Sequence, residues 1–67
     1  GSLKLSQIVQ TLVLENDIVE ILYNPILSQR PYLIRWINYD NQKYEFRVNS
    51  NDIQELVSFL QRALEHE

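Results

Sequence analysis

The absence of cysteine constrains this chain more than any other feature of its sequence, because it removes disulfides and thiolate metal sites from a chain of 67 residues. Chains this short bury a smaller share of their surface than larger domains do, and most of them add a disulfide, a metal or a partner chain. The one histidine, His66, lies next to the C-terminus. Apolar burial is therefore what must hold the fold together.

Apolar side chains are abundant enough for that task. Leucine, isoleucine and valine alone supply 22 residues, as 10 Leu, 7 Ile and 5 Val. One small core cannot enclose them all, so we expect some to be buried against another chain or another domain. No apolar run reaches the ~18 residues of a membrane span, and no signal peptide pattern is present. We therefore expect no membrane contact and a cytoplasmic location.

The first two residues, Gly1 and Ser2, are typical of what a protease leaves after it removes a tag. We exclude them and expect a single α+β domain over residues 3–67, which could be a segment of a longer protein.

Residues 3–14 carry two conflicting patterns. A helix is favoured by apolar residues at i, i+3, i+4, i+7 and i+8, namely Leu5, Ile8, Val9, Leu12 and Val13. A first strand is the alternative, because residues 11–14 are rich in β-formers and Asn16 with Asp17 could turn the chain into the next strand.

Three further segments predict strands. Residues 18–23 and 32–39 are β-branched and aromatic, and residues 43–48 alternate polar and apolar side chains throughout. Residues 24–31 form a loop between Pro25 and Pro31. A three-residue loop at 40–42 would place Tyr44 and Phe46 on the same face as Trp36, and so collect these aromatics into one core layer.

Residues 52–66 predict an amphipathic helix, which Ser50 or Asn51 would cap. Its stripe consists of Ile53, Leu56, Val57, Leu60 and Leu64. The predicted fold is a small antiparallel three-stranded meander with an N-terminal helix (or fourth strand) and a C-terminal helix packed on one face. The four-stranded order is similar in topology to single-strand-binding coactivator and Whirly-type domains, although no motif accompanies that similarity.

Catalytic and metal-binding patterns are lacking. The paired carboxylates Glu20 and Glu45 are expected on adjacent strands, where pairing with arginine fits them better than acid–base chemistry. The only glycine is Gly1, so a glycine-rich phosphate loop is excluded. Asparagine and aspartate cluster at 38–41 and 49–52, where they suit turns and helix caps. We predict no enzyme, no catalytic residue, no cofactor and no metal.

A protein partner is the best-supported alternative. Ile26 and Leu27 are large aliphatic residues on a loop that should lie at the surface. The strand at 18–23 holds one charge, Glu20, so we expect it to be a weakly guarded sheet edge. Tryptophan, tyrosine and arginine are enriched at interface hot spots. The predicted partner-binding residues are Glu20, Ile26, Leu27, Arg35, Tyr39 and Arg47.

Three functions follow from these patterns. The first is a non-catalytic protein–protein interaction or assembly module that binds another copy of itself or a larger assembly. The second is a single-stranded nucleic-acid-binding domain that uses the hairpin face, and it is disfavoured because nine acidic residues outnumber six basic ones. The third is an accessory or regulatory domain of a larger enzyme.

Overall fold

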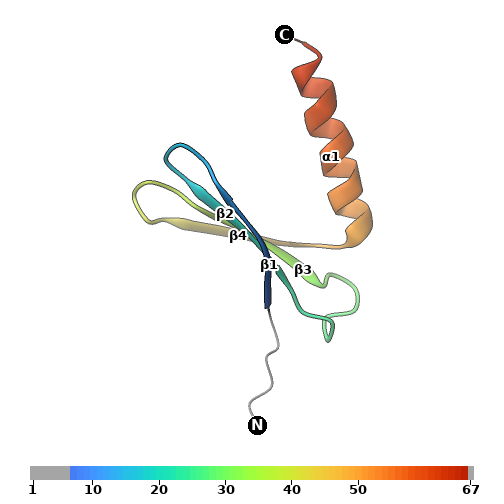
Figure 1. Ribbon diagram of the computed structural model, residues 1–67. Helices are drawn as coiled ribbons and strands as arrows, with labels where there is room; N and C mark the ends of the chain where they lie inside the picture. Colours follow the sequence, from blue (N-terminus) through green and yellow to red (C-terminus); the bar gives the residue numbers. More distant parts are fainter. Residues whose placement is uncertain (1–6, 67) are drawn as a thin grey trace.

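The computed structural model describes residues 7–66, which form one antiparallel sheet and one helix (Figure 1). The elements are β1 (Gln7–Val13), β2 (Ile18–Tyr23), β3 (Tyr32–Ile37), β4 (Lys43–Val48) and α1 (Ser50–Leu64). The strands lie side by side in chain order, β1-β2-β3-β4. The α+β class is confirmed. Gly1, Ser2 and residues 3–6 of the first predicted segment lie outside the described residues.

The helix favoured for residues 3–14 is wrong over the described part, where β1 forms a strand. A β-bulge explains the misleading pattern, because the register with β2 shifts between Ile8 and Gln10. The extra residue changes the phase of alternation, so apolar residues on the two sides of a bulged strand imitate helical spacing. The short connection that follows is closed by a hydrogen bond of 2.8 Å from the Leu14 N–H to the Asp17 carbonyl oxygen.

The β3–β4 hairpin confirms the predicted faces with a shifted register. Trp36 lies opposite Tyr44. The three-residue loop occupies 39–41 rather than 40–42, because the Asn38 N–H donates to the Gln42 carbonyl oxygen at 3.0 Å. Asn41 has a φ of 64°, a left-handed conformation that asparagine tolerates well. The register therefore moves by two residues, which leaves every side chain on its predicted face.

The β2–β3 loop is organised by a buried asparagine. The Asn24 side chain accepts a hydrogen bond of 3.1 Å from the Ile26 N–H. The backbone N–H of Asn24 donates to the Pro31 carbonyl oxygen at 2.8 Å, and the backbone carbonyl of Asn24 accepts from the Leu27 N–H at 3.1 Å. This arrangement makes a tight turn with Pro25 in its second position.

The helix begins earlier than predicted. Asn49, rather than Ser50 or Asn51, is the N-cap, and it forms a capping box with Asp52. The Asn49 side chain accepts from the Asp52 N–H at 2.8 Å, while the Asp52 carboxylate accepts from the Asn49 N–H at 3.3 Å. Asn49 is the one residue between β4 and α1, and its extended backbone sets the direction in which the helix leaves the sheet.

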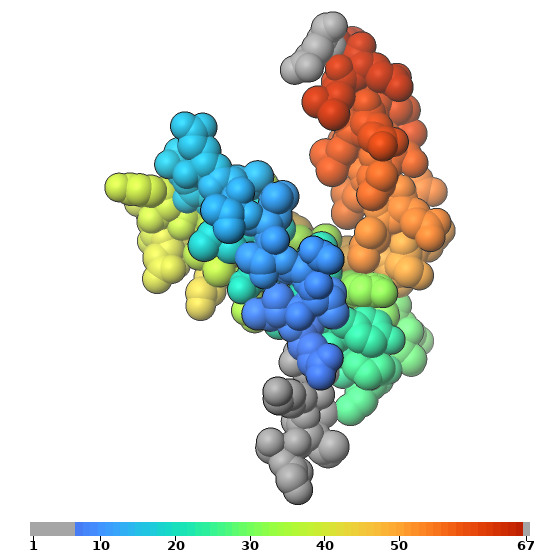
Figure 2. Space-filling model, viewed as in Figure 1, coloured from blue at the N-terminus to red at the C-terminus, as the bar shows by residue number. Residues whose placement is uncertain are grey.

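That direction takes α1 away from the sheet, which contradicts the prediction that the helix packs on one face (Figure 1). No residue of α1 is buried. Among the described residues the only buried apolar side chain is Leu22, which is 8% exposed. Figure 2 shows the open space between the helix and the strands. The predicted aromatic core layer is therefore present as a face but is not covered.

Candidate functional site

The sheet register sorts the strand residues into an apolar face and a charged face. Side chains alternate between the two faces along each strand, so residues paired across the strands share a face. Three cross-strand rows make up the apolar face: Leu12, Val19, Trp36 and Tyr44; Gln10, Ile21, Ile34 and Phe46; Gln7, Tyr23, Tyr32 and Val48. None of the twelve residues in these rows is charged.

The opposite side of the sheet, the charged face, is centred on Arg35. Its guanidinium donates to Glu45 on β4 at 2.7 Å and to Glu20 on β2 at 3.3 Å. Arginine suits this position, because its planar guanidinium can donate to one carboxylate on each of the two neighbouring strands. The hydrogen bond to Glu45, opposed by partial desolvation and reinforced by Glu20, raises the pKa of Arg35.

This ladder corrects the expected placement of the two carboxylates. Glu20 and Glu45 lie on strands that are separated by β3, and both are held by the same arginine. Carboxylates that act together on one substrate need an open space between them, whereas here Arg35 occupies that space. The charged face is consequently a structural ladder.

The apolar face is largely exposed at its β3–β4 end. Trp36, Tyr44 and Phe46 are each more than a third exposed. With Asp17 and Asn38 they line a shallow cavity of about 470 Å³. The Trp36 indole N–H donates to the Asp17 carboxylate at 2.7 Å, which fixes the ring on this face. Exposed aromatic side chains with a polar rim are typical of an interaction surface.

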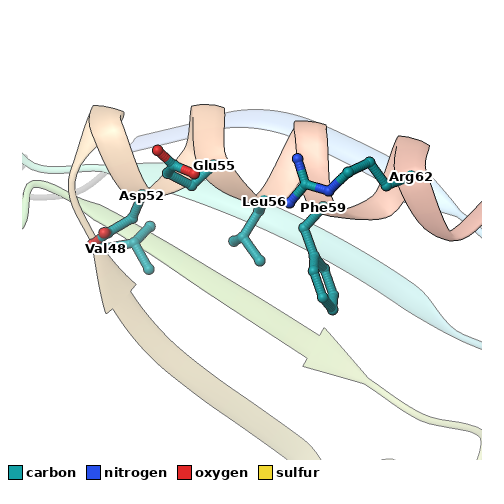
Figure 3. A pocket seen from close by; sticks show the side chains of 6 residues that line it. All are labelled: Val48, Asp52, Glu55, Leu56, Phe59 and Arg62. Carbon is teal, nitrogen blue, oxygen red and sulfur yellow. The ribbon is translucent and has the colours of Figure 1, made fainter.

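A second cavity lies where α1 leaves the sheet, and we call it the helix–sheet cleft. It has a volume of about 530 Å³ and is lined by Val48, Asp52, Glu55, Leu56, Phe59 and Arg62. Figure 3 shows Leu56 and Phe59 pointing from the helix toward the strands. Val48 belongs to the apolar face, so the cleft joins that face to one side of α1.

The helix also carries apolar residues beyond this cleft. Val57, Leu60 and Leu64 are 50%, 58% and 65% exposed and do not line the cleft. Together with Leu56 and Phe59 they form one broad apolar stripe along α1. This stripe is open, which is unusual for an amphipathic helix in a folded protein.

The residues predicted to bind a partner are dispersed. Glu20 and Arg35 are brought together in the ladder, and Leu27 and Arg47 line a third cavity of about 440 Å³ with Ser28, Gln29 and Arg30. Ile26 is 66% exposed on the loop at that end of the sheet.

Tyr39 lies apart from all of these residues. It is 81% exposed in the hairpin turn at the opposite end of the sheet. The six predicted residues therefore do not form one surface.

The sequence patterns place the residues of the apolar face and of the α1 stripe in the core, so they do not indicate that these residues form a binding surface. The hairpin pattern predicts Trp36, Tyr44 and Phe46 in one core layer, and the stripe of the C-terminal helix is predicted to pack on one face of the sheet. The signal that could have identified them is the excess of apolar residues over what one small core can enclose. Periodicity shows which residues share a face, but it does not show what covers that face.

The sheet edges also differ from expectation. The strand predicted as an edge, residues 18–23, is β2, which lies between β1 and β3. The edges are β1 and β4. β4 carries Lys43, Glu45 and Arg47, which guard it, whereas β1 has no charge and is guarded only by its bulge.

The distribution of charge bears on nucleic-acid binding. The exposed aromatic residues of the strands, Trp36, Tyr44 and Phe46, lie on the apolar face, whereas the strand cations Lys43, Arg35 and Arg47 lie on the charged face. Single-strand binding combines stacking with phosphate contacts in one groove. Here the two requirements are met on opposite sides of the sheet.

Two further surveys cover only the residues that the structure describes. Within residues 7–66 no group of three or more His, Asp or Glu side chains is placed to hold a metal ion. The helix in this part of the chain lacks the length and the hydropathy to cross a membrane.

Comparisons with protein-family models, with curated proteins and with solved structures found no match to this chain.

Proposed function

We propose that this protein is a non-catalytic assembly module that associates with further copies of itself. The observation that carries the proposal is the pair of uncovered apolar surfaces, the apolar face of the sheet and the stripe of α1. A chain without disulfides needs apolar burial to stay folded. The single chain leaves most of its large apolar side chains exposed, and a partner would bury them.

The exposed area suits a stable interface. Nine large side chains on the two surfaces are 37% to 65% exposed: Leu12, Trp36, Tyr44, Phe46, Leu56, Val57, Phe59, Leu60 and Leu64. At roughly 100 Å² for each of them, their burial would remove about 900 Å² per chain, above the ~800 Å² per partner of a standard interface. The rows of the apolar face hold no cation, and the Asp17 carboxylate at its rim is negative, which favours another apolar surface over a nucleic acid.

The test is the solution mass by light scattering across a range of concentrations. We expect a stable dimer or a higher oligomer for the wild-type chain. Leu60→Asp should dissociate it, because the new carboxylate would be buried without a partner. Ser58→Asp is the matched control: it adds the same charge to the exposed polar side of α1 and should leave the mass unchanged.

Circular dichroism accompanies both variants, so that loss of the fold is distinguished from loss of association. A monomeric wild-type chain at all concentrations would contradict the proposal. Leu27→Asp reports on the loop: dissociation by this variant, with Leu60→Asp still assembled, would move the interface to the 24–31 loop.

A further inference from the structure

The helix–sheet cleft is an incomplete site within a single chain. On the sheet side it is lined by Val48, from which the apolar face continues along β4 to Phe46 and Tyr44. Its other wall is the side of α1 that presents Leu56 and Phe59 (Figure 3). Two apolar walls that face one open space call for an apolar occupant between them.

The chain's own helix does not fill the cleft. One residue, Asn49, joins β4 to α1, and its capping box holds the helix at the angle seen in Figure 1. The Ile53 N–H adds a hydrogen bond of 3.1 Å to the Asn49 carbonyl oxygen. To fold back onto its own sheet, α1 would have to rearrange this junction. An element from a second chain requires no such change.

A second α1 has the properties that the cleft demands. The two sides of the cleft converge at Asn49, so an occupant must be apolar over a broad arc of its surface. The stripe of α1 is broad, because helical spacing runs it from Phe59 and Leu56 through Leu60 to Val57. Its 15 residues span about 22 Å, which matches the ~20 Å of a six-residue strand.

We propose that two copies of this chain exchange helices, so that α1 of each copy lies in the helix–sheet cleft of the other. This arrangement rests on the proposed self-association and specifies its geometry. Each copy offers the same helix and the same cleft, so the contact is two-fold symmetric and closes after two chains. Leu60 of one copy then lies against the aromatic residues of the other copy's apolar face.

Disulfide cross-linking tests this geometry directly, because the chain has no cysteine of its own. Copies that carry Phe46→Cys and copies that carry Leu60→Cys are tagged differently, mixed by unfolding and refolding, and oxidised. We expect a cross-linked dimer that contains both tags, with the Phe46–Leu60 linkage identified by mass spectrometry.

The matched control replaces Phe46→Cys with Lys43→Cys, which lies on the same strand but on the charged face. The yield of the cross-linked dimer between Lys43→Cys and Leu60→Cys should be lower by a factor of about ten or more. Disulfides form only at Cα separations of about 4–7 Å.

The other outcomes separate the two proposals. A dimer by light scattering that gives no Phe46–Leu60 disulfide overturns helix exchange and leaves self-association standing. A dimer formed by pairing of β1 edges would give this result. A chain that carries both Phe46→Cys and Leu60→Cys could instead form the disulfide within itself and keep the mass of a monomer. That result shows that α1 covers its own sheet, and it also overturns helix exchange. A chain that is monomeric at every concentration overturns both proposals.

Discussion

At the scale of single residues, the Arg35 side chain links β2, β3 and β4 on the charged face. It lies on β3 and contacts one carboxylate on each neighbouring strand. The sequence predicts Arg35 as a partner-binding residue, because arginine is enriched at interface hot spots. In the fold its hydrogen-bonding capacity is directed to Glu20 and Glu45, so its first role is to hold the sheet.

Arg35→Lys should lower the free energy of unfolding by about 1 kcal/mol, because a lysine ammonium can reach one carboxylate but not hold both. The loss is modest because Glu45 is 44% exposed and solvent screens the pair. Urea denaturation at a fixed protein concentration measures it. Arg47→Lys is the control, since no ion pair of Arg47 occurs within residues 7–66. An equal loss in the two variants would contradict the assigned role of the ladder.

At the scale of elements, the start of α1 determines how the whole chain presents its apolar surface. The capping box at Asn49 and Asp52 begins the helix directly after β4. The sequence offers three candidate caps in a row, and only the extended backbone of Asn49 lets its side chain accept from the Asp52 N–H. A cap at Ser50 or Asn51 would have left a longer and more pliable connection.

Asn49→Ala should lower the free energy of unfolding by about 1 kcal/mol, because the Asp52 N–H loses its acceptor. Asn51→Ala is the matched control and should be neutral or slightly stabilising, since Asn51 lies within α1 and alanine is the better helix former. Urea denaturation at one protein concentration compares them. A larger loss for Asn51→Ala would show that the helix begins later than Asn49.

At the scale of the whole molecule, the sheet and helix make two arms with an open cleft between them (Figure 2). The strands contact one another extensively, whereas no residue of α1 is buried. Leu22 is the only buried apolar side chain within residues 7–66, so this part of the chain lacks the enclosed core that usually stabilises a domain of this size. Association would then provide much of the stability, and the folded state would depend on protein concentration.

The melting temperature should accordingly rise by about 5 °C for each tenfold increase in protein concentration, as expected for a dimer of 67-residue chains that unfolds to two monomers. Circular dichroism over a hundredfold range of concentration measures the shift. The Leu60→Asp variant should melt at a lower temperature that does not change with concentration. A wild-type chain whose melting temperature is constant over that range would contradict a stabilising association.

The sequence by itself determined the local structure of this protein wherever one pattern acted alone. Strict alternation predicted β4 with both bounds correct, and β-branched residues did the same for β2. Pairing across the hairpin then placed Trp36, Tyr44 and Phe46 on one face, because alternation survives a register shift of two residues.

Only the tertiary structure decided what depends on neighbours distant in the chain. The bulge in β1 disguised a strand as a helix, and the strand order made β2 central rather than an edge. The sequence predicted an apolar stripe on α1 but not its contact partner. An amphipathic helix needs some apolar surface to cover it, and its own sheet or a second chain would serve the pattern equally well. The angle set at Asn49 directs α1 away from its own sheet, so the stripe is left open.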